Sequence, residues 1–175
     1  LFQADERVKF LVGDGGQFED LPRDLSTFRA IIRDRRNDEH IILAGLHTAF
    51  LLFHNRLVDR LRASGVSEEF DEARRLARWH YQWIVVHEFL PQLVGQATVS
   101  DVLGNGRRHY TSDVGFMPVE FQGAAFRVGH SMVRPSYRAN LAGDDGKPFF
   151  ALVFEPAESG KTDPNDLSGG TRAPR

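Results

Sequence analysis

The sequence predicts a mainly α-helical fold with a few short strands and one hydrophobic core. Three segments support this, because apolar side chains recur in them at three- and four-residue steps: residues 37–63, 68–91 and 118–135. With 175 residues, 41% hydrophobic and 26% charged, the chain has the composition of one ordinary globular domain. Its 22 basic and 24 acidic residues are interspersed, so no basic face indicates a nucleic-acid partner.

Residue types exclude several kinds of site. The absence of cysteine rules out a disulfide framework, a thiolate metal site and a cysteine nucleophile. The longest apolar run, residues 41–53, contains His47 and is too short to cross a bilayer. The glycine-rich stretch at residues 13–16 has no following lysine, so it is not a phosphate-binding loop.

The first half of the chain predicts a loop-rich lead-in followed by two long helices. Glycines and Pro22 in residues 1–36 favour loops with one turn of helix. The first long helix begins with Asn37 or Asp38 as its N-cap and ends before Gly65. The second begins near Glu68 in an acidic stretch, and Pro91 kinks or ends it.

The second half predicts shorter elements. Residues 92–110 form a short helix and a turn, and a third helix follows with Pro118 at its first position, until Pro135 prevents its extension. Residues 149–154 have the length and residue types of a buried strand, and residues 156–175 form an irregular tail. Five residues of the third helix are expected to share one face: Val119, Gly123, Phe126, His130 and Val133.

The sequence leaves two interpretations of His130 open. A histidine on an apolar helix face is usually a hydrogen-bonded core residue. It is alternatively a metal or haem ligand, because neutral imidazole binds iron and the neighbouring glycines and alanines let a flat group approach. His47 and His54 lie seven residues apart, a spacing typical of packed faces, and the charged residues 33–40 have the composition of a solvated helix start.

Three blocks together resemble the animal-type haem peroxidase family, in particular its bacterial members. They are "RNDEHIILAGLHTAFLLFHNRLVD", "EARRLARWHYQWIVVHEFLP" and "FQGAAFRVGHSMVRPSY", and the resemblance covers about residues 10–155. One family pattern is met by Arg36, Glu39 and the pairs His47-Thr48 and His54-Asn55. The proximal-ligand motif of the family is met by Phe126, Arg127, Gly129 and His130.

The resemblance implies a haem peroxidase-like helical domain and a role for several residues. His130 would be the proximal ligand of the iron of haem b, with Phe126 and Arg127 also in contact with the cofactor. Arg36 would be the distal catalytic residue, whose permanent charge stabilises the negative charge that develops on the leaving oxygen of peroxide. In the family, the glutamate at the position of Glu39 forms an ester with a haem methyl group.

The resemblance also implies that important parts of the site belong to other segments. Family members take the peroxide proton with a distal histidine upstream of the matching region, near an aspartate and most of a calcium-binding loop. The asparagine that orients the proximal histidine lies downstream. We therefore expect this chain to be the central fragment of a longer domain, inactive by itself, with His47 and His54 packing between helices.

The function expected from the resemblance is a haem-dependent peroxidase that reduces hydrogen peroxide and oxidises a small electron donor. One alternative is a fatty-acid dioxygenase of the same superfamily, although that chemistry typically uses a tyrosine beside the proximal histidine and "FRVGHSM" has none. Another is a non-catalytic helical interaction module. No nucleic-acid partner and no membrane span are expected, and the sequence does not decide the compartment, although many relatives are exported.

Overall fold

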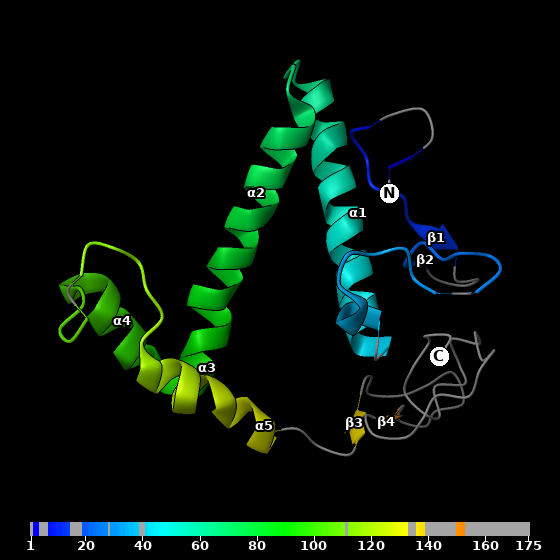
Figure 1. The fold of residues 1–175 in the computed structure, drawn as a ribbon. Coiled ribbons are helices and arrows are strands. Elements are labelled where there is room, and N and C mark those ends of the chain that lie inside the picture. The colour runs from blue at the N-terminus through cyan, green and yellow to red at the C-terminus, as the bar shows by residue number, and fades with distance from the viewer. Residues whose placement is uncertain are drawn as a thin grey trace. The chain divides into compact units, whose positions relative to one another are not determined.

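The computed structural model describes residues 2–3, 7–14, 19–27, 29–38, 41–110, 112–132, 136–138 and 150–152. Helices dominate the described residues (Figure 1), which agrees with the mainly α-helical prediction. The chain divides into two compact units, one made of Leu1–Ala77 and Arg134–Arg175 and the other of Arg78–Val133. The boundary falls within one long helix, so that helix contributes residues to both units.

The lead-in carries more structure than loops alone. Strands β1 (Gly13–Asp14) and β2 (Glu19–Asp20) pair antiparallel, with Gly13 opposite Asp20. A side chain at position 13 would collide with the carbonyl of Leu21, so the close approach of the backbone here requires glycine. The single helical turn expected in this region is a 3-10 helix, η1, at Arg35–Asp38.

Helix α1 (Ile41–Ala63) is the first long helix of the prediction. It ends where Gly65 adopts a positive φ of 74°, as the sequence predicts. Its start differs from the prediction, because Asn37 and Asp38 belong to η1 and residues 39–40 lie outside the described part of the chain. Both carboxylate oxygens of Asp38 accept hydrogen bonds from Arg23.

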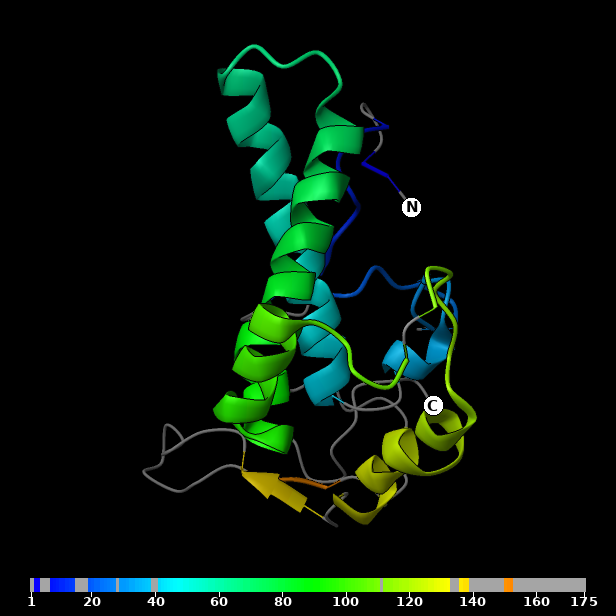
Figure 2. The same cartoon turned by 90° about the vertical axis from the view of Figure 1, so that its left-hand side faces the viewer.

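Helix α2 (Glu69–Ile84) follows α1 after a turn, and its first turns lie beside the end of α1 in both views (Figures 1 and 2). Its first turn is acidic, which suits the positive end of the helix dipole. The core between the two helices is formed by Leu57, Val58 and Ala73. Five partly buried residues pack against this cluster: Val8, Phe53, Leu61, Leu76 and Ala77. Apolar burial therefore joins α1, the first half of α2 and the lead-in.

The sequence predicted that Pro91 either kinks or ends the second helix. Helical residues continue through Pro91, so it does not end the helical path. The chain passes from α2 through a π-helical turn, η2 (Val85–Phe89), into α3 (Leu90–Val94). The N–H of Leu90 bonds to the carbonyl of Val85, five residues back. Proline has no N–H and clashes with the carbonyl four residues earlier, and a wider turn relieves that clash.

Two glycines with positive φ end the next helices. Gly95 (φ 84°) follows α3, and Gly106 (φ 78°) follows α4 (Gln96–Asn105). The short helix and turn predicted for residues 92–110 are therefore confirmed.

The third predicted helix is an irregular helical segment, and we call residues 119–132 the His130 segment. It begins after Pro118, then forms a π-helical turn, η3 (Phe121–Ala125), a 3-10 turn, η4 (Phe126–Val128), and α5 (Gly129–Met132). The prediction that five residues of this segment share one face assumed α-helical spacing throughout. That assumption was wrong, because π-helical and 3-10 turns differ from an α-helix in their number of residues per turn. Val133 lies outside the described residues.

The last described element is a small antiparallel sheet of β3 (Ser136–Arg138) and β4 (Phe150–Leu152), with Ser136 opposite Leu152. It confirms a strand within residues 149–154. The tail predicted at residues 156–175 lies outside the described residues. Among the described helices, none is both long and apolar enough to span a bilayer.

Candidate functional site

Arg36 lies on a turn that is stabilised by hydrogen bonds to Asp34. We call residues 34–38 the Arg36 turn. One carboxylate oxygen of Asp34 accepts the backbone N–H of Arg36 at 3.1 Å and its Nε at 2.9 Å. The other accepts a terminal guanidinium nitrogen of Arg36 at 2.6 Å. The Arg36 side chain is 80% exposed. These hydrogen bonds lower the pKa of Asp34 to about 2, so the pair is fully charged at neutral pH.

A mostly buried ion cluster binds the other end of this turn. The guanidinium of Arg23 donates to both oxygens of Asp38, at 2.9 and 2.8 Å, and to both oxygens of Asp20, at 2.9 and 3.4 Å. Only 13%, 11% and 10% of the Arg23, Asp20 and Asp38 side chains is exposed. Burial alone would lower the pKa of Arg23, but the hydrogen bonds and charges of Asp38 and Asp20 outweigh burial and raise it. Sequence reasoning missed Arg23.

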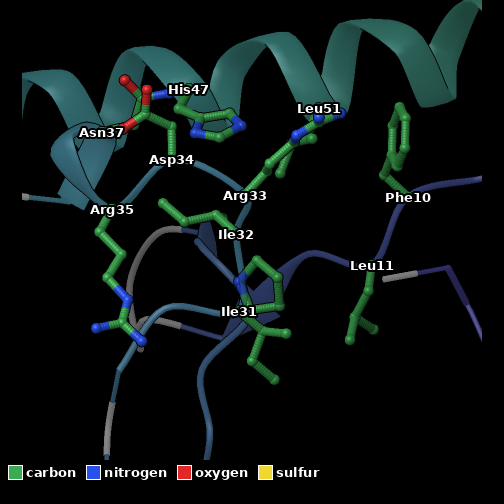
Figure 3. Close-up of a pocket in the computed structure, with 11 residues that line it drawn as sticks. Phe10, Leu11, Ile31, Ile32, Arg33, Asp34, Arg35, Asn37, His47 and Leu51 are labelled. Carbon is green, nitrogen blue, oxygen red and sulfur yellow. The ribbon is translucent and has the colours of Figure 1, made fainter.

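A pocket of about 600 Å³ lies between α1 and the lead-in (Figure 3). Its lining consists of apolar residues with a polar side toward the Arg36 turn: Phe10, Leu11, Pro22, Ile31, Ile32, Arg33, Asp34, Arg35, Asn37, His47 and Leu51. His47 lines it from α1, and its Nδ1 is buried without a hydrogen-bond partner among the described residues. Burial lowers the pKa of His47, and the charge of Asp38 partly offsets this, so the ring is neutral at pH 7.

His54 packs between helices, as expected. It is 3% exposed, and its ring centroid lies 4.5 Å from that of Phe10 and 5.4 Å from that of Phe70 on α2. Burial lowers the pKa of His54; polar atoms of Asn55 and the Phe70 backbone oppose this only in part, and neither completes a hydrogen bond of normal geometry. The histidine is therefore a neutral packing residue.

Asn55 fixes the lead-in against α1. Its amide oxygen accepts the N–H of Phe10, and its amide nitrogen donates to the carbonyl of Phe10, both at 2.8 Å. This two-point bond replaces the pairing that a neighbouring strand would give. The histidine-asparagine pair of the family pattern therefore has a structural explanation in this chain.

His130 lies on α5 at an exposed position, and its Nδ1 is 3.2 Å from the carbonyl oxygen of Arg127. A carbonyl only accepts, so Nδ1 is the donor in this contact, and Nε2 is the other ring nitrogen. A metal-ligating histidine typically donates its other N–H to such an acceptor, which fixes the ring orientation. An imidazole held in this way can bind a metal ion through Nε2 when the ring is neutral.

The surroundings of His130 fit a flat apolar group. Phe126 is 67% exposed, and Val128 and Met132 are also exposed on the same segment. A Cβ added at Gly123 or Gly129 would meet no atom within 4 Å, so the backbone is open to close approach. These features suit a porphyrin, whose iron needs one axial nitrogen from the protein.

The other predicted cofactor residues have local partners. Arg127 turns its Nε back to the carbonyl of Gln122 at 3.2 Å, and the Phe126 ring lies 6.0 Å from that of Phe121. Phe126, Arg127 and His130 thus lie within one short helical stretch. Arg36 belongs to the other compact unit, and Glu39 lies outside the described residues. Within the described part, no three histidine, aspartate or glutamate side chains gather to hold a metal ion.

Comparisons with known proteins agree on one family. Residues 18–157 match the family described as animal haem peroxidase. The human probable oxidoreductase PXDNL is 31% identical over 134 residues, which are 71% of this chain and 9% of that protein. Human eosinophil peroxidase is 35% identical over 106 residues, 58% of this chain and 15% of that protein. Heme peroxidase 2 of Caenorhabditis elegans is 33% identical over 111 residues, 58% and 16% respectively. The chain thus spans only a small part of these relatives.

Proposed function

Because this chain belongs to the animal haem peroxidase family, we propose that it supplies two parts of the haem site of a longer peroxidase domain. His130 would hold the haem iron, and Arg36 would act on hydrogen peroxide. When bound, haem supplies the redox chemistry that reduces hydrogen peroxide and oxidises a small electron donor. Peroxide and that donor are therefore the proposed partners.

The observation that carries the proposal is the contact between Nδ1 of His130 and the carbonyl of Arg127. In the proposed site, Nδ1 of His130 donates to this carbonyl, and Nε2 of the neutral ring would hold the iron. Exposed Phe126 offers apolar surface to the cofactor beside the ligand. Arg127 adds a cation on the same segment, which suits the carboxylates of haem b.

Arg36 contributes a charge that is independent of pH. Its guanidinium stabilises negative charge on an oxygen that leaves with the electron pair of a breaking oxygen-oxygen bond. Asp34 holds that guanidinium with two side-chain hydrogen bonds, and 80% of the Arg36 side chain is exposed. Glu39, three residues further, is the proposed site of an ester bond to haem.

The remaining parts of the site are assigned to segments outside this chain. They are the base that accepts the peroxide proton, the residue that orients His130 from behind, and the calcium ligands. We propose the division into a lead-in at residues 1–36, a helical core at 37–135 and a tail at 156–175 within a single peroxidase domain. The isolated chain is accordingly expected to be inactive.

The ligand assignment is tested in the complete protein. His130→Ala should abolish or shift the Soret absorption band, whereas His109→Ala, which changes another exposed histidine of the same unit, should leave it unchanged. Peroxide-dependent oxidation of a phenolic dye should fall in parallel with the band. An unaltered Soret band in the His130→Ala protein would contradict the assignment.

A further inference from the structure

The position of Arg36 depends on contacts made by other residues, because its own side chain is 80% exposed and little packing surrounds it. The backbone of the Arg36 turn therefore determines where the guanidinium can reach. Asp34 fixes the beginning of the turn, since its carbonyl accepts the N–H of Asn37 at 3.1 Å and its carboxylate accepts the N–H of Arg36. Asp38 is the last residue of the turn and is 8% exposed.

Arg23 holds Asp38 from a loop in which several backbone hydrogen bonds are formed. The N–H of Ile31 donates to the carbonyl of Pro22 at 2.7 Å. The N–H of Asp24 donates to the carbonyl of Arg29 at 2.9 Å. Arg23 also forms an isolated antiparallel bridge with Ala30. The backbone on both sides of Arg23 is thus fixed before its side chain reaches the turn.

The guanidinium of Arg23 has the geometry for holding two carboxylates at once. Its planar fork donates two hydrogen bonds to Asp38 and two to Asp20, and Asp20 also accepts the N–H of Leu21 at 2.8 Å. Lysine could not reproduce this arrangement, because its ammonium is a point charge without a fork. The cluster therefore joins β2, the loop after it and the Arg36 turn at one point.

We propose that Arg23 is a positioning residue for the reaction with peroxide, which it serves by holding Asp38 and hence the turn that presents Arg36. This inference rests on the proposed function for the identity of Arg36 as the catalytic residue. The structural part, that Arg23 holds the turn, is independent of haem.

The first experiment measures the turn without any activity. Hydrogen exchange of the complete protein is followed on peptides that cover residues 31–38, with and without haem. Arg23→Gln should speed exchange there while peptides around Val58 and Ala73 in the core stay protected. Arg108→Gln, which breaks an exposed ion pair with Asp101, should change neither region. Unchanged exchange at residues 31–38 in Arg23→Gln would overturn the inference.

The second experiment measures whether Arg23 acts through Arg36. Arg36→Gln should lower the second-order rate with hydrogen peroxide by about 100-fold, and Arg23→Gln by about tenfold, since a small misplacement is costly. In the double variant, the loss should equal that of Arg36→Gln alone within about twofold, because residues that act through one group are not additive. Additive losses would overturn the inference, since Arg23 would then act on something else.

Two further outcomes separate the possible failures. If Arg23→Gln does not fold, the test uses Arg23→Lys, which keeps the positive charge without the planar fork. Faster exchange at residues 31–38 together with a lower rate with peroxide would support the inference. Wild-type values of both the exchange rate and the peroxide rate would overturn it. If Arg36→Gln leaves the peroxide rate unchanged, the proposed function of Arg36 fails and takes the positioning role with it. The exchange data would still show whether Arg23 holds the turn.

Discussion

The Arg36 turn and the His130 segment hold their functional side chains in different ways. The Arg36 turn depends on side chains, since Asp34 and the carboxylate cluster around Arg23 bind its two ends. The His130 segment depends on its own backbone, because the contacts of His130 and Arg127 are to carbonyl oxygens within five residues. The first arrangement is therefore sensitive to single substitutions at a distance, and the second is not.

Removal of Arg23 should have the largest effect on stability. Arg23→Met leaves the carboxylates of Asp20 and Asp38 mostly buried and without their cation, which should cost about 3 kcal/mol in the free energy of unfolding. Urea unfolding of the complete protein measures this cost. Arg108→Met, which breaks the exposed ion pair with Asp101, is the matched control and should show no measurable change. Equal effects of the two variants would break the contrast.

Removal of the Asn55 amide should have the next largest effect. Asn55→Ala leaves the N–H and carbonyl of Phe10 without the partners that hold the lead-in on α1, at a cost of about 2 kcal/mol. Proteolysis in the first ten residues should accelerate as well, because the lead-in loses its attachment. An unchanged cleavage rate would show that the ring contacts of Phe10 with Phe2, His54 and Phe70 are enough to hold the lead-in.

Acid should destabilise the unit that contains His54 and His47. Burial lowers the pKa of both below the ordinary value of 6.5, so both are neutral in folded and unfolded states above pH 7. As the pH falls below about 6.5, only the unfolded state gains the protons, and each histidine removes up to about 1.4 kcal/mol of stability per pH unit.

The measurement compares urea midpoints at pH 7.5 and 5.5. His54→Phe should reduce the loss between the two values, because a phenylalanine fits among Phe10 and Phe70 and does not titrate. His109→Gln, at an exposed position, is the control and should retain the full loss. If His54→Phe loses as much stability between pH 7.5 and 5.5 as the wild-type protein, the acid sensitivity comes from other groups.

Truncation of Arg127 should have the smallest effect. Arg127→Ala removes one exposed side-chain bond to a carbonyl and should change the free energy of unfolding by less than about 0.5 kcal/mol. The carbonyl of Arg127, which orients His130, is kept in the alanine variant. A large loss of stability would show that the segment depends on side chains after all.

Sequence reasoning predicted the regular elements well and the irregular ones poorly. Apolar spacing and Gly65 located α1, and the apolar run at residues 149–154 located β4, because both depend on local pattern. The π-helical turn before Pro91 was not predicted, since the sequence marks proline as a break without showing how neighbouring turns adapt.

The candidate site, too, was predicted from the sequence only in part. The resemblance identified Arg36, Glu39 and His130 as residue types in order, but the partners of Arg36 and His130 came from the structure. Arg23 and Asp38 are 15 residues apart, a separation that no helical or strand period connects. The acceptor of His130 is a main-chain carbonyl, and a carbonyl leaves no signal in the residue letters.

The wide turn at Val85–Phe89 corresponds to one additional residue inserted into an otherwise continuous helical rod. Each residue of an α-helix advances the axis by about 1.5 Å and rotates it by about 100°. Loss of a single codon there would let the rod close into regular α-helix while the side chains from Leu90 to Val94 keep close to their present directions, because the wide turn spreads about the same rotation over one more residue. The turn therefore accommodates an additional residue without changing the phase of the chain beyond it.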